Sequence, residues 1–150
     1  MTSRWLVFGA LAVVLSSAAL AQQPRYAARD NPRLADIMEA ARVRHLKLWF
    51  AGRARNWELA DYEAAQLKAR LEDAASLYQS LPVTDVTTMA APLDALSAAI
   101  AAKNPAKFTA AFDQLTAGCN SCHQGNARGF IEIRQPTAQP FSNQEFEGKR

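Results

Sequence analysis

Residues 104–123 read NPAKFTAAFDQLTAGCNSCH, and this stretch sets the fold that the rest of the chain has to complete. Asn104 followed by Pro105 is typical of a helix start, because asparagine caps a first turn well and proline is tolerated in it. Side chains suited to a core then recur at three- and four-residue spacing: Phe108, Phe112, Leu115, Cys119 and Cys122. This period predicts one helix that buries an aromatic face and aims both cysteines into the same core.

Three more helices are predicted upstream of this one. The first runs from about Pro32 to Ala51 and ends at Gly52, with an inward stripe of Leu34, Met38, Ala41, His45 and Leu48. The second follows an N-cap at Asn56 and continues to about Ser80. The third is capped by Thr84 or Asp85 and is expected to have a short first piece, then a break or kink before Pro92, and a main piece over 93–103. The sequence therefore predicts an all-α, antiparallel four-helix bundle over about residues 32–123.

The two ends of the chain differ from this bundle. Residues 1–21 resemble a secretory signal peptide, with Arg4, an apolar run over 5–15 and an Ala-x-Ala site at 19–21. The apolar run is short for a transmembrane helix, which leaves an uncleaved anchor as the alternative. Glycines and prolines make residues 124–150 a non-helical tail, expected to fold back over the cysteine end of the bundle. We therefore expect a leader, 1–21, and a single domain, 22–150, exported to a periplasm and free of the membrane after cleavage.

The only two cysteines lie in Cys119-Asn120-Ser121-Cys122-His123, a single C-x-x-C-H. This is the attachment signature of a c-type haem: each thiol can form a thioether to a haem vinyl group, and the next residue presents an imidazole to the iron. The pattern predicts one covalent haem, held by Cys119, Cys122 and His123. The alternatives are a thiol–disulfide redox pair and a structural disulfide closing a very small loop. Zinc would need four ligands, and the chain has only two cysteines and two histidines.

A helical bundle with a lone C-x-x-C-H late in its fourth helix resembles the class II c-type cytochromes, the cytochrome c-prime and c-556 group. Class I cytochromes c instead carry the motif near the mature N-terminus. The resemblance is specific at residues 119–123 and loose over the rest of the bundle. Two features depart from that group: the 27 residues that follow His123, and the segment RHLKLWFAG at 44–52. The resemblance also allows a homodimer formed through the first two helices.

The sequence leaves three possibilities for the sixth ligand of the iron. Members of the resembled group that have a sixth ligand take a methionine from the first helix, which implies Met38. His45 is the other histidine of the chain and lies on the same inward stripe. Either residue can equally be a core side chain, which would leave the iron five-coordinate. Trp49, Trp57 and Phe130 are candidates for packing on the porphyrin.

The leading functional prediction is a monohaem electron carrier that exchanges electrons with a redox partner protein. The alternative is a binder of nitric oxide or carbon monoxide at an open sixth position. A thiol–disulfide oxidoreductase is the third possibility, and it would need Cys119 at a helix N-terminus. We find no arrangement typical of an enzyme, and Glu58, Asp61 and Glu63 are expected on a solvated helix face.

The charge is mild, at +3 for 150 residues, and no basic run interleaved with aromatics predicts a nucleic-acid partner. Basic residues do gather near the end of the first helix: Arg42, Arg44, Lys47, Arg53 and Arg55. They form either a solvated face or a surface that steers an acidic redox partner or contacts haem propionates.

Overall fold

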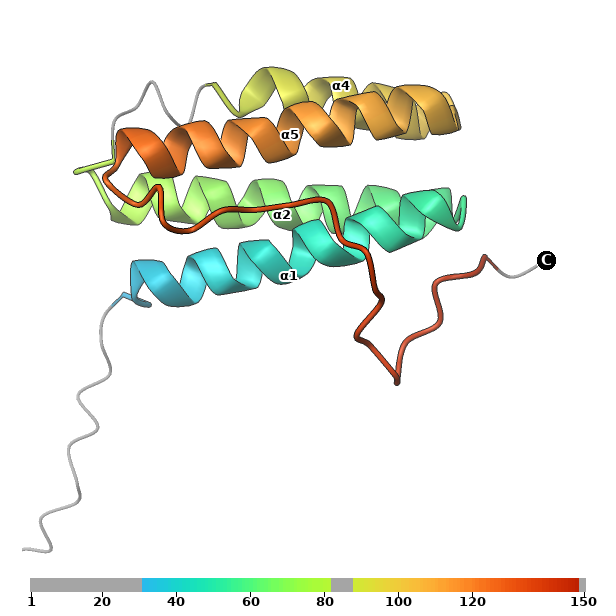
Figure 1. The fold of residues 1–150 in the computed structure, drawn as a ribbon, viewed down its shortest axis with the longest axis horizontal. Helices are drawn as coiled ribbons and strands as arrows, with labels where there is room; N and C mark the ends of the chain where they lie inside the picture. The colour runs from blue at the N-terminus through green and yellow to red at the C-terminus, as the bar shows by residue number, and fades with distance from the viewer. Residues whose placement is uncertain (1–30, 82–87, 149–150) are drawn as a thin grey trace, which may run out of the picture.

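The computed structural model describes residues 31–81 and 88–148, and these residues form four α-helices and an irregular tail. The helices are α1 (Leu34–Arg53), α2 (Trp57–Leu77), α4 (Ala90–Ala101) and α5 (Pro105–Gly125). Each helix runs antiparallel to the one before it (Figure 1), and the described residues contain no strand. The prediction of an all-α four-helix bundle is confirmed. The expected leader at 1–21 and the expected caps Thr84 and Asp85 lie outside the described residues.

Asparagine caps define two of the helix starts as the sequence predicts. The Asn56 side chain accepts a hydrogen bond from the backbone N–H of Leu59, and Asn104 accepts one from that of Lys107. Both bonds satisfy N–H groups that a first turn leaves without a helical partner. The second helix ends at Leu77, about one turn earlier than expected.

The expected break directly before Pro92 is wrong in its position: residues 88 and 89 form a turn and the helix then runs through Pro92, while residues 84–87, where the short first piece was expected to begin, lie outside the described residues. The helix α4 begins at Ala90, so Pro92 is its third residue and lies within its first turn. The first four N–H groups of a helix make no intrahelical bond, so a proline there costs none. The signal that we interpreted as an interruption is therefore part of a helix start.

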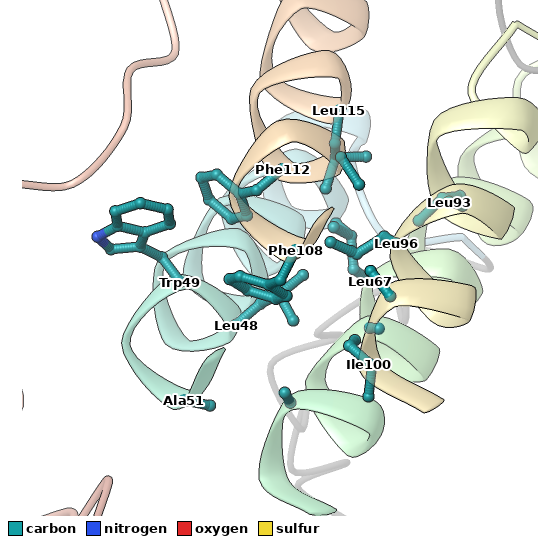
Figure 2. Packing of buried hydrophobic residues seen from close by; sticks show 14 of the residues in the cluster. Leu48, Trp49, Ala51, Leu67, Leu93, Leu96, Ile100, Phe108, Phe112 and Leu115 are labelled. Atoms are coloured by element: carbon teal, nitrogen blue, oxygen red, sulfur yellow. The ribbon is translucent and has the colours of Figure 1, made fainter. Parts of the chain in front are cut away.

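The core is concentrated where the C-terminal half of α1 crosses the N-terminal half of α5. Trp49 lies with its ring centroid 4.8 Å from that of Phe112 and 6.4 Å from that of Phe108. Leucines of all four helices close around these rings, as Figure 2 shows for Leu48, Leu67, Leu96 and Leu115. Gly52 permits the close crossing, because a Cβ there would lie 2.1 Å from the Phe108 ring. Burial of these large rings contributes strongly to the stability of the fold.

The helices pack mainly as two pairs, α1 with α2 and α4 with α5, while α1 meets α5 over a short stretch. The start of α1 and the ends of α2 and α5 lie at the same end of the bundle (Figure 1). There the Tyr78 hydroxyl donates a hydrogen bond to the Pro32 carbonyl oxygen, 2.7 Å away. We call this the motif end, because Cys119, Cys122 and His123 belong to it, and the opposite end the aromatic end.

The tail runs back along the bundle instead of staying at the motif end (Figure 1). Its first part, 128–133, lies against the last turns of α5, as expected. Its last part reaches the aromatic end, where the buried Phe146 ring packs 5.9 Å from that of Phe50. Lys47 lies over the Phe141 ring, 4.8 Å from its centroid. The apolar residues of the tail are thus divided between both ends of the bundle, which corrects the expectation that all of it covers the motif.

Candidate functional site

The two cysteines occupy successive turns near the end of α5, and both are half-buried thiols. Cys119 packs against the edge of the core cluster. Burial raises the pKa of the Cys119 thiol to about 11, with the neighbouring Cys122 as a second cause. Redox-active cysteines have lowered pKa values and are commonly found at helix N-termini. The position and the environment of Cys119 are therefore the opposite of what a thiol–disulfide oxidoreductase requires.

The imidazole of His123 is held by the tail through one defined ring nitrogen. Its Nδ1 lies 2.8 Å from the carbonyl oxygen of Ile131. A carbonyl oxygen can only accept a hydrogen bond, so Nδ1 carries the proton and donates it. In the neutral ring, the lone pair then resides on Nε2. This is the usual arrangement of a metal-binding histidine, whose second nitrogen donates to a carbonyl or carboxylate that fixes the ring.

Asn120, between the two cysteines, binds the tail a second time. Its Nδ2 donates to the carbonyl oxygen of Ile133 at 2.9 Å, and its Oδ1 accepts from the N–H of Ile133 at 2.8 Å. In the C-x-x-C-H pattern, Asn120 occupies one of the two unspecified positions. Nothing in the local sequence could have revealed this role, because the partner is the backbone of a residue 13 positions away.

His45, a candidate iron ligand, is a hydrogen-bonded core residue in this structure. It is 4% exposed, and its ring centroid lies 4.4 Å from that of Phe112. Its Nε2 lies 2.8 Å from the Thr116 hydroxyl, which itself donates to the Phe112 carbonyl oxygen at 2.9 Å. The hydroxyl proton is thereby used, so Nε2–H of His45 is the donor to Thr116. Burial lowers the pKa of His45 to about 4.

The antiparallel register of α1 and α5 places Met38, the other candidate, level with His123. The contacts of His45 with Thr116 and of Trp49 with Phe112 fix this register. Met38 lies seven residues before His45, and His123 lies seven residues after Thr116, so both are about 10.5 Å further toward the motif end. The side chain of Met38 is half-buried there. The structure thus brings Met38, and not His45, to the height of the motif.

The three aromatic candidates for a porphyrin contact lie in different places. Trp49 belongs to the aromatic core, and Trp57 packs edge-on against Phe108, 6.1 Å between centroids. Phe108 is eleven residues before Cys119, about 16 Å along the helix axis, so Trp57 lies at the far end of the bundle. Phe130 is close to the motif in sequence but its ring is 80% exposed.

The acidic residues of α2 differ from the prediction at one position. Glu58 and Asp61 are exposed as expected, but Glu63 is 2% exposed. Its Oε2 lies 3.1 Å from the guanidinium nitrogen Nη1 of Arg44 on α1. The expectation of a solvated Glu63 is therefore wrong, because α1 covers this carboxylate and supplies a cation to it.

The basic cluster near the end of α1 makes several local contacts. Arg42 pairs with Glu39 one turn away, and the guanidinium carbon of Arg53 lies 5.5 Å from the centroid of the Trp49 ring. With Arg44 bound to Glu63 and Lys47 over Phe141, four of its five members have partners within the chain. These contacts account for much of the cluster without a ligand.

The residues of the motif end fit a covalently bound haem by the chemistry of their donors. Two thiols lie on adjacent turns, and an imidazole beside them presents Nε2. Among residues 31–81 and 88–148, no group of three or more His, Cys, Asp or Glu side chains could hold a bare metal ion. A haem iron needs fewer protein ligands, because the porphyrin occupies its equatorial positions.

Comparisons with known proteins add no further assignment. The chain matches no family model, no curated protein and no solved structure. Within the described ranges, no helix combines the length and the apolar character that a bilayer span requires.

Proposed function

We propose that this protein is a monohaem c-type cytochrome and works as an electron carrier, not as an enzyme. The observation that carries the proposal is the hydrogen bond from His123 Nδ1 to the Ile131 carbonyl oxygen. It orients the imidazole next to Cys119 and Cys122 and leaves the free electron pair on Nε2. The likeness of the bundle and the motif to the class II cytochromes c supports the same conclusion. A bound haem would supply one-electron chemistry at its iron.

Each residue of the motif end has a defined part in this proposal. Cys119 and Cys122 would hold the group through thioethers, and His123 would ligate the iron through Nε2. Met38 would provide the sixth ligand, since it is level with His123 whereas the Nε2–H of His45 is engaged by Thr116. Six-coordinate iron favours electron transfer over the binding of a diatomic gas, which needs an open or displaceable position.

The proposed location is the periplasm, with residues 1–21 removed during export. Covalent attachment through C-x-x-C-H takes place outside the cytoplasm, so the leader and the motif require the same compartment. The physiological partner would be another redox protein.

The first experiment measures the mass of the exported, processed chain produced in cells with haem-attachment machinery. We expect the polypeptide plus one haem. A Cys119→Ala, Cys122→Ala double variant provides the matched control, since it should carry no covalent group. A wild-type mass equal to that of the bare polypeptide would overturn the proposal.

The second experiment separates the electron carrier from the gas binder. We expect a low-spin absorption spectrum for the reduced protein that does not change when carbon monoxide is added. Met38→Ala should become high-spin and bind carbon monoxide, while His45→Ala, if it folds, should remain low-spin. A wild type that is high-spin and binds carbon monoxide would instead support the gas-binding alternative.

A further inference from the structure

The first part of the tail is held to α5 at two points that flank the Ile131 carbonyl. Before it, the N–H of Arg128 donates to the carbonyl oxygen of His123 at 2.7 Å. The N–H of Ile131 in turn donates to the carbonyl oxygen of Arg128 at 2.8 Å. After it, Asn120 binds both backbone groups of Ile133 at 2.8 and 2.9 Å. The carbonyl that accepts the His123 proton therefore lies between a turn and a two-point clamp.

An asparagine amide is suited to this clamp for a geometric reason. Its oxygen and nitrogen present one acceptor and one donor side by side, which match the N–H and C=O of a single residue. A backbone residue paired in this way cannot rotate or slide along the helix without breaking both bonds. Ile133 is only two residues beyond Ile131, so fixing it also restricts the carbonyl of Ile131.

The apolar side chains next to the Ile131 carbonyl hold this part of the tail less firmly than the clamp does. The side chains of Phe130 and Ile131 are exposed, at 80% and 44%. Phe130 buries little apolar surface, so its packing contributes little to the position of this segment, while Ile133 itself is half-buried. The next side-chain contact to α5 is a hydrogen bond from Gln135 to Asp113, 3.1 Å long and exposed.

We propose that Asn120 is a positioning residue for His123. By clamping Ile133 it holds the Ile131 carbonyl where Nδ1–H of His123 donates to it, and this fixes the tautomer that leaves Nε2 free. This inference deepens the proposed function. A hydrogen bond to Nδ1 makes Nε2 a stronger electron donor, which favours the oxidised metal ion. Loss of the clamp should therefore shift the reduction potential of the haem-loaded protein upward.

The test begins with the full chain produced without haem, so that it does not depend on haem attachment. Nitrogen-15 NMR of the His123 ring at pH 8 reports which nitrogen carries the proton. We expect the Nδ1–H form to dominate in the wild type, and Asn120→Ala to give a mixture of both tautomers. Gln135→Ala is the matched control, because it removes the neighbouring tail contact and leaves the clamp intact; its spectrum should equal that of the wild type.

A second variant covers the case in which Asn120→Ala does not fold. Asn120→Asp retains the acceptor for the Ile133 N–H and loses the donor, so a partial loss of the Nδ1–H form is expected. A mixture of tautomers in the wild type, or a wild-type spectrum in a folded Asn120→Ala protein, would overturn the inference.

Potentiometry of the haem-loaded variants then supplies the functional readout. Asn120→Ala should have a higher potential than both the wild type and Gln135→Ala; equal potentials would contradict the role in tuning the iron. If the NMR result holds but mass spectrometry finds no haem, the positioning of His123 stands and the proposed function fails. The two ideas therefore fail in different measurements.

Discussion

The aromatic end and the motif end of the bundle are built in different ways. At the aromatic end, Phe108 and Phe112 are at most 1% exposed and pack against tryptophans of α1 and α2. At the motif end, Cys119, Cys122 and His123 are half-buried, and hydrogen bonds to the tail hold the polar side chains. The helix α5 supplies the phenylalanines of one end and the motif of the other.

The difference indicates a division between stability and chemistry. Apolar burial is non-directional and scales with area, so the large buried rings of the aromatic end contribute strongly to the free energy of folding. Hydrogen bonds contribute less but specify orientation, which a ligand to a metal requires. His45 and Thr116 lie between the two ends and close the aromatic core toward the motif.

The largest effect is expected for Phe112→Ala at the aromatic end. Removing a fully buried ring should lower the free energy of unfolding by about 3–5 kcal/mol, measured by urea denaturation. Phe130→Ala is the control, because its ring is 80% exposed; that change should stay within about 0.5 kcal/mol. Equal losses for the two variants would contradict the division between the ends.

A pH dependence of stability should come from His45 at the boundary. Because burial lowers its pKa from 6.5 to about 4, the unfolded chain binds more protons than the folded chain between these pH values. The contribution of His45 to the free energy of unfolding is greatest above pH 6.5. It falls as the pH drops toward 4, by about 3 kcal/mol in total. Urea denaturation across this range should show a flatter profile for His45→Gln than for the wild type. A slope unchanged in His45→Gln would count against a buried, neutral His45.

A smaller loss is expected when the close crossing of α1 and α5 is blocked. Gly52→Ala places a methyl group against the Phe108 ring, which is buried on all sides. Overpacking of this kind should cost about 1–3 kcal/mol, although alanine favours the helix. Gly129→Ala is the matched control, since its new Cβ would lie 3.5 Å from the nearest side-chain atom, Cγ of Gln124, which is an ordinary van der Waals contact. Thermal unfolding of both variants checks this, and a stabilised Gly52→Ala protein would show that the crossing can relax.

The smallest effect on stability is expected at the motif end. Met38→Leu conserves volume at a half-buried position, so it should change the unfolding free energy of the haem-free protein by less than about 1.5 kcal/mol. The same change in the haem-loaded protein should remove the sixth ligand and alter the absorption spectrum. A stability loss as large as that of Phe112→Ala would mean that the motif end also belongs to the main core.

Much of the fold could be predicted because its signals are local. Asparagine caps and the spacing of Phe108, Phe112 and Leu115 depend on neighbouring residues alone, so the helices and the inward face of α5 follow from the sequence. Pro92 was misjudged because the same residue can end a helix or occupy its first turn, and only the location of the start distinguishes the two.

The sequence by itself determined the four helices, the C-x-x-C-H motif and the position of that motif late in the last helix. Only the tertiary structure decided which ring nitrogen of His123 is protonated, that His45 belongs to the core, that Glu63 is buried, and where the tail lies. The physical reason is that these properties depend on partners far away in the sequence: a backbone carbonyl, a hydroxyl on another helix, a guanidinium on α1. Hydrogen bonds and burial between such groups exist only once the helices have packed.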